Sequence, residues 1–111
     1  MDLLQLTQSE TADCVITDPH TGEPTDFVVT LYGPGTKQYK EALKIFTANK
    51  EGEKDAEALA IVTAGWEGFQ NNGKPFPFTK ENAEMAYSQS IALKAQVSSF
   101  MFGIKNFLPK R

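Results

Sequence analysis

The sequence is poor in the groups that most enzymes and metal sites use. It holds a single cysteine, Cys14, and a single histidine, His20. One cysteine excludes a disulfide within the chain and is typical of a reducing compartment. His20 has no partner histidine or cysteine at the spacing of a metal site. We therefore expect no catalytic residues, no cofactor and no metal, and we interpret Cys14 as a small apolar strand residue.

Positive charge and long apolar runs are also scarce. Eleven lysines and arginines stand against fourteen acidic residues, which gives a formal net charge of −3. Nucleic-acid binding usually needs a basic excess, so we expect no nucleic-acid partner. No segment approaches the roughly twenty apolar residues that span a bilayer, and the first residues lack the basic start of a signal peptide. We expect a soluble intracellular protein without membrane contact.

What is present fits a small folded domain. The chain has 111 residues, of which 41% are hydrophobic and 23% charged, a composition typical of globular proteins. We predict an α+β fold in which an N-terminal β-hairpin precedes a bundle of about four helices. The predicted parts are an N-terminal arm at 1–13, the hairpin at 14–32 and a helical region at 36–108, all within a single compact domain.

The hairpin prediction depends on two apolar runs with a turn between them. Residues 12–17 and 26–32 are rich in β-branched residues and flank D-P-H-T-G-E-P-T, which is rich in turn formers. Neither face of the second run is clearly polar. Because an isolated hairpin is marginal in water, it must pack on helices, pair with another strand or meet a second subunit. The two apolar faces predict self-association.

Periodicity predicts four helices, at about 37–49, 55–65, 80–90 and 91–108. Thr36 and Thr79 are suitable N-cap residues for the first and third. The first helix places Tyr39, Ala42, Leu43 and Phe46 on one face, and the last carries an apolar stripe up to residue 108. Phe102 falls off this stripe, so it is either part of a partner surface or a single exposed aromatic residue.

The stretch 61–82 holds the only tryptophan and a group of phenylalanines. The pattern places Trp66 at the end of the second helix, predicts a tight turn at Asn71-Asn72-Gly73 and predicts extended backbone at Lys74–Phe78. Phe69, Phe76 and Phe78 would then join Trp66 in one aromatic cluster. That cluster is either core packing, a stacking site for a base or sugar, or a groove for a protein partner.

Residues Leu59–Ala83, L-A-I-V-T-A-G-W-E-G-F-Q-N-N-G-K-P-F-P-F-T-K-E-N-A, resemble the central motif of a protein family. The family comprises the tail assembly chaperones of tailed phages and prophages of the long-tailed siphophage type. Its motif is a helix ending in T-x-G-W, a D/N-G turn, P-x-P-F/Y-[ST]-x-E-N and a further helix. Segments 18–24, 33–42 and 96–108 are also similar to members. The motif and candidate partner-surface residues here are Trp66, Phe69, Gly73, Pro75, Phe76, Phe78, Glu81, Asn82 and Phe102.

The resemblance implies a non-enzymatic function. Such chaperones bind the tape-measure protein, keep it soluble in the host cell cytoplasm and assist polymerisation of tail-tube protein around it. The expected partners are therefore the tape-measure protein, the tail-tube protein and further copies of this chain. Two alternatives stay open: a structural minor tail or head–tail connector protein of the virion, and an enzyme or nucleic-acid binder of host origin.

Overall fold

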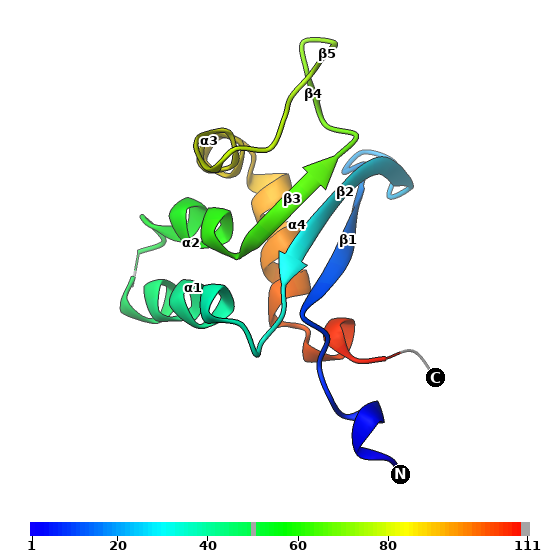
Figure 1. Ribbon diagram of the computed structural model, residues 1–111. Helices are drawn as coiled ribbons and strands as arrows, with labels where there is room; N and C mark the ends of the chain where they lie inside the picture. Colours follow the sequence, from blue (N-terminus) through cyan, green and yellow to red (C-terminus); the bar gives the residue numbers. More distant parts are fainter. Residues whose placement is uncertain (50, 110–111) are drawn as a thin grey trace.

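The computed structural model describes residues 1–49 and 51–109 and confirms the α+β class with a β-hairpin followed by helices. Within this part of the chain, four α-helices accompany an antiparallel sheet of strand order β1–β2–β3. In Figure 1, α4 runs behind the sheet while α1, α2 and α3 lie beside its β3 edge. The elements in order are η1 (Leu3–Gln5), β1 (Thr11–Thr17), β2 (Pro24–Tyr32), α1 (Lys37–Ala48), α2 (Asp55–Val62), β3 (Thr63–Glu67), β4 (Gln70–Asn71), β5 (Lys74–Pro75), α3 (Lys80–Gln89), α4 (Ile91–Phe102) and η2 (Ile104–Phe107).

The hairpin lies where the sequence predicts it. β1 and β2 pair from Thr11↔Tyr32 to Thr17↔Pro24, so the last residues of the predicted arm belong to the first strand. Alternation sends Cys14 and its partner Val29 to the buried face of the sheet. The opposite face is open in part, and Val15 there is 48% exposed.

The prediction that the second helix continues to Gly65 is wrong. Helix α2 ends at Val62, and Thr63–Glu67 forms β3, which pairs with β2 through Val29↔Trp66 and Thr30↔Gly65. Glycine is a poor helix former, and β2 would otherwise leave a row of backbone groups unpaired. The sequence required the hairpin to pack on helices, pair with another strand or meet a second subunit. The structure provides a further strand from the same chain.

The prediction of one helix from residue 91 to 108 is also wrong at its end. Helix α4 stops at Phe102 because the chain turns at Gly103, and the Phe100 carbonyl accepts hydrogen bonds from the Gly103 N–H at 3.1 Å and from the Asn106 Nδ2 atom at 3.0 Å. The short η2 then returns Phe107 to the core, where its ring lies 5.6 Å from that of Phe100. A side-chain amide thus replaces the next helical hydrogen bond.

One cluster of buried side chains joins the sheet to the helices. Thr36 caps α1 as predicted, since its Oγ1 accepts a hydrogen bond of 3.2 Å from the backbone N–H of Tyr39. Each fully buried leucine or phenylalanine contributes roughly 1.5–3 kcal/mol to folding. Hairpin and helices therefore share one core, whose largest fully buried members are Tyr87, Phe107, Leu31, Leu59, Met101, Val29, Val62 and Val97.

Candidate partner-binding surfaces

Five aromatic rings, termed the aromatic cluster, gather where β3 passes into the β4–β5 hairpin. The Trp66 ring stacks on Phe76 with centroids 6.1 Å apart and an angle of 17° between planes. The ring edges of Phe27, Phe69 and Phe78 meet it at 5.9, 5.3 and 5.1 Å. Phe27 and Phe69 in turn stack at 4.0 Å. Phe76 and Phe78 thus both reach Trp66, as their predicted alternation requires.

Backbone geometry forces these rings together. Gly68 has φ +77°, and a side chain there would overlap the carbonyl oxygen of Asp26 in β2. The chain therefore crosses β2 closely enough to lay Phe69 on Phe27. The predicted turn is confirmed, because Asn72 (φ 54°) and Gly73 (φ 78°) join the paired strands β4 and β5. This pair of positive φ values is the geometry that an Asn-Gly sequence favours.

Hydrogen bonds fix the cluster to the backbone. The indole Nε1–H of Trp66 donates to the Phe76 carbonyl at 2.8 Å, and the Phe76 N–H donates to the Phe69 carbonyl at 2.9 Å. An indole N–H that leaves water needs such an acceptor. Trp66, Phe69, Phe76 and Phe78 are all partly buried and pack against the core. Of the three readings of this cluster, internal packing accounts for most of its contacts.

The rest of the motif builds the start of α3. Thr79 caps the helix as predicted, because its Oγ1 accepts a bond of 3.0 Å from the N–H of Asn82. The Asn82 side chain reaches back and donates from Nδ2 to the Pro77 carbonyl at 2.9 Å. Glu81 is exposed in the first turn, where its charge suits the positive end of the helix. Pro75 is exposed in β5. The motif is therefore one connected turn, strand and cap.

Phe102 lies apart from the motif. It ends α4, at the opposite end of the molecule from the β4–β5 hairpin in Figure 1. Its side chain is 50% exposed and meets the ring of Phe46 edge-on at 5.5 Å. Ile104, two residues on, is 51% exposed. The structure thus brings eight of the nine candidate residues together and leaves Phe102 on a separate, more open apolar surface.

Two hydrogen-bond networks, one buried and one partly buried, were not predicted from the sequence. The Thr63 hydroxyl donates to the Leu59 carbonyl at 2.7 Å, so the Tyr87 hydroxyl, also at 2.7 Å, donates to Thr63. Burial raises the pKa of Tyr87. The second network lies at the β1 edge, where Gln96 accepts from the N–H of Thr17 at 2.8 Å and donates to its carbonyl at 2.9 Å. Gln96 therefore caps the end of an edge strand as a neighbouring strand would.

The chemistry-bearing residues lie in ordinary surroundings. Cys14 is 4% exposed, and burial raises the pKa of its thiol to about 11, which disfavours the nucleophilic thiolate. His20 is exposed in the β1–β2 turn, where its backbone N–H is bonded to Asp18. Among residues 1–49 and 51–109, no group of three or more His, Cys, Asp or Glu side chains is placed to hold a metal ion.

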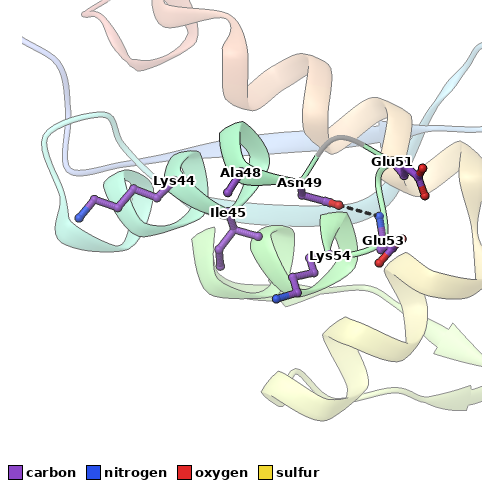
Figure 2. Close-up of a pocket in the computed structure, with 7 residues that line it drawn as sticks. All are labelled: Lys44, Ile45, Ala48, Asn49, Glu51, Glu53 and Lys54. Atoms are coloured by element: carbon purple, nitrogen blue, oxygen red, sulfur yellow. Dashed lines mark hydrogen bonds between the residues drawn. The ribbon is translucent and has the colours of Figure 1, made fainter.

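The sequence did not predict the hollows beside α1. One of about 500 Å³ lies between the end of α1 and the start of α2, and Figure 2 shows Lys44 and Ile45 on one side of it and Glu53 on the other. A second of about 500 Å³ lies along the outer face of α1 and is lined by Lys40, Leu43, Lys44, Thr47 and Ala48. Leu43 belongs to the predicted apolar stripe but is 40% exposed here. The lysines on either side of Leu43 in the sequence pattern were the signal that could have predicted its exposure.

Comparisons of the chain with protein-family models, with curated proteins and with solved structures found no match. None of the described helices is long and apolar enough to cross a membrane.

Proposed function

We propose that the protein is a tail assembly chaperone of a long-tailed phage or prophage. It binds the tape-measure protein, keeps it soluble in the host cell cytoplasm and assists polymerisation of the tail tube. The observation that carries the proposal is the motif at Leu59–Ala83. Its hallmark residues act together on the local backbone: Trp66 and Asn82 each donate a hydrogen bond to a backbone carbonyl, and Gly73 supplies the positive φ of the turn. Because the motif forms one connected structural unit in this chain, it supports the proposal that the chain shares the architecture of the family it resembles.

The surfaces of the chain support the same proposal. A chaperone for a long apolar helix needs uncovered apolar side chains on a rigid frame rather than a reactive group. Phe102 and Ile104 are half exposed, and Phe102 rests on Phe46, which packs against the core. In the proposed function, this surface at the end of α4 takes the partner helix. The aromatic cluster holds the frame together and contributes its exposed edges at most.

Self-association is also part of the proposal, but the two apolar faces of the hairpin are no longer its main reason. The hairpin satisfies one edge within the chain, because β2 pairs with β3 as well as with β1. The β2 edge therefore needs no second subunit, while the face that carries Val15 stays open in part. Exposed apolar residues remain elsewhere on the chain. The tail assembly chaperones that the chain resembles act beside repeated tail-tube subunits. We expect copies of this chain to meet each other and the tail-tube protein through those residues.

Co-expression with the tape-measure protein encoded in the same genome tests the proposal. We expect a soluble complex that co-purifies. Phe102→Asp should abolish it, whereas the matched control Ile91→Asp, at a residue 79% exposed at the other end of α4, should retain it. If the tape-measure protein stays insoluble and nothing co-purifies with the wild-type chain, the proposal is wrong.

A second experiment separates the chaperone from a structural protein of the virion. An assembly chaperone leaves the particle, so mass spectrometry of purified virions should find the tube and tape-measure proteins without this chain. Its presence at the stoichiometry of a minor tail or head–tail connector protein would replace the chaperone proposal with that alternative.

A further inference from the structure

The turn between β4 and β5 holds an asparagine followed by a glycine at its tip. Asn72 and Gly73 are both exposed, and their hairpin projects away from the sheet and the helices (Figure 1). Over the part of the chain that the structure describes, neither the Asn72 side chain nor the Gly73 backbone N–H has a hydrogen-bond partner. A Cβ added at Gly73 would meet nothing within 4 Å. The Asn72 amide and the Gly73 nitrogen are therefore accessible and free to move.

The backbone here forms a type I′ turn. Pairing up to Asn71↔Lys74 leaves two loop residues, and both have positive φ, 54° at Asn72 and 78° at Gly73. In this turn type ψ at the first loop residue is about +30°. The type II′ turn, which also joins two-residue hairpins, keeps that residue's φ near about +60° and has ψ of about −120°. The two turns thus differ mainly by rotation of the peptide plane between Asn72 and Gly73. Gly73 tolerates the change of sign in its own φ because it has no Cβ.

That rotation brings the Gly73 nitrogen beside the Asn72 side chain. With ψ of about −120°, the nitrogen eclipses Cβ across the Cα–C bond, as a five-membered ring requires. The nitrogen then attacks Cγ: a bond from Gly73 N to Cγ forms, the Cγ–Nδ2 bond breaks, and the Gly73 N–H proton leaves with Nδ2 as ammonia. Water opens this cyclic imide at either carbonyl carbon, its hydroxyl going to the carbon and its proton to the nitrogen. The products are aspartate and isoaspartate, in which the main chain runs through Cβ.

The other asparagines of the described chain lack this combination of features. The side-chain amides of Asn49, Asn82 and Asn106 each donate a hydrogen bond to another residue. Asn71 is exposed like Asn72, but it lies in the paired strand β4 and is followed by a residue with a side chain. Position in the turn, and not exposure alone, therefore selects Asn72.

We propose that Asn72 is a site of spontaneous deamidation, and that the cyclic imide with the Gly73 nitrogen forms in the folded chain by rotation of this one peptide plane. The hairpin stays closed during the reaction, because the Phe76 N–H is bonded to the Phe69 carbonyl at 2.9 Å and the Phe76 carbonyl to the Trp66 indole. The product places a carboxylate in residues 70–75, where Lys74 is the one charged residue of the sequence. This inference goes beyond the tail-assembly role and does not depend on it, because the reaction needs only water.

Peptide mapping by mass spectrometry follows the reaction on the full chain in mildly alkaline buffer. We expect aspartate and isoaspartate at position 72, separated by chromatography, while Asn71, Asn82 and Asn106 keep their amides. A synthetic peptide of residues 69–76 in the same buffer shows that the conditions permit the chemistry. If Asn72 of the folded chain stays intact after the peptide has fully reacted, the proposal is overturned.

The variant Asn72→Gly separates the turn from the local sequence. It moves the asparagine–glycine pair back by one position and keeps the turn, because glycine also adopts the positive φ at position 72. Asn71 is then followed by glycine but lies in the paired strand. It should react at least about tenfold more slowly than Asn72 does in the wild type, because its peptide plane must first leave the strand pairing. Equal rates would mean that the sequence alone decides, and they overturn the role of the turn.

Two destabilised variants test whether the hairpin stays closed. Gly68→Ala disturbs the crossing over β2, and the milder Trp66→Phe removes the hydrogen bond to Phe76. Asn72 should react within about twofold of the wild-type rate in both, since opening of the hairpin does not limit a reaction of the closed form. Any larger rise that follows the loss of stability overturns the folded-state route. Trp66→Phe decides the question if Gly68→Ala does not fold, and circular dichroism verifies the fold of each variant.

Discussion

Gly68 provides the sharpest test of how the motif is built, because two other glycines serve as its controls. Gly22, Gly68 and Gly73 have φ values of +76°, +77° and +78°, so alanine pays the same backbone penalty at each. That penalty is about 1–2 kcal/mol. Their surroundings differ. A Cβ at Gly22 or Gly73 meets nothing within 4 Å, whereas one at Gly68 overlaps the Asp26 carbonyl oxygen and lies 2.8 Å from its carbon.

The expected result follows from that difference. Gly22→Ala and Gly73→Ala should each lower the free energy of unfolding by about 1–2 kcal/mol. Gly68→Ala should cost a further 1–3 kcal/mol or so, because β2 and the segment after β3 must separate to admit the methyl group. The total of roughly 2–5 kcal/mol is a large share of the 5–15 kcal/mol that holds a typical domain together.

Urea unfolding of the three variants measures these values. Circular dichroism follows the whole fold, and the fluorescence of the only tryptophan, Trp66, follows the aromatic cluster; coincident transitions establish two-state behaviour. In Gly68→Ala the emission should also shift to longer wavelength, since lifting Phe69 from Phe27 lets water reach the indole. If Gly68→Ala and Gly73→Ala lose the same stability within about 0.5 kcal/mol, the close crossing is not a structural constraint and the account of the cluster fails.

Three further predictions concern single residues. Trp66→Ala should lower the free energy of unfolding by about 3 kcal/mol, at the low end for tryptophan because the ring is partly buried. Trp66→Phe should lower it by about 1 kcal/mol, because the hydrogen bond to Phe76 is lost. If urea unfolding followed by circular dichroism gives a loss below about 1 kcal/mol for Trp66→Ala, the packing role is refuted. Burial raises the folded pKa of Cys14 to about 11 from an ordinary 9.0, so the unfolded chain ionises first and stability should fall as pH rises from about 9 to 11, by up to roughly 3 kcal/mol. Urea midpoints should lose the Cys14 share of that slope in Cys14→Ala, most clearly between pH 9 and 10, because burial also raises the pKa of Tyr39 and Tyr87 and leaves a decline above about pH 10. Gln96→Ala should cost about 1–3 kcal/mol and speed hydrogen exchange of the Thr17 amide, and unchanged exchange would contradict the edge cap.

Local rules predicted the parts of the fold that local chemistry decides. The caps at Thr36 and Thr79 and the turn at Asn72–Gly73 each depend on a few neighbouring residues, and all are as expected. The errors fall where distant residues decide. The pattern of T-A-G-W-E is compatible with the end of a helix, and only the free edge of β2 makes Thr63–Glu67 a strand. The stripe of the last helix continues across Gly103, but the Asn106 amide and the core site for Phe107 turn the chain there.

The candidate site was predicted in composition but not in role. Spacing and the resemblance selected the aromatic residues of the motif, and the structure brings them together. Their burial could not be read from spacing, because it depends on Phe27, which lies some forty positions away from the nearest of them in another strand. Conversely, the exposure of Leu43 was not predicted, because this residue fits the buried stripe of its helix equally well. Whether such a residue is covered depends on the position of α2, which periodicity does not specify.

The division of apolar residues between packing and exposure determines where binding must be sought. Around the β4–β5 hairpin the aromatic rings contact one another and the backbone, so a substitution there changes stability first and binding only as a consequence. Several exposed apolar residues lie outside the motif, among them Leu3 and Leu4 in η1, Phe102 at the end of α4 and Ile104 in η2. In Figure 1, η1, the end of α4 and η2 lie at the end of the molecule opposite the β4–β5 hairpin. Polar substitutions at that end leave the core intact, and they therefore separate loss of a partner from loss of the fold in a way that no substitution in the motif can.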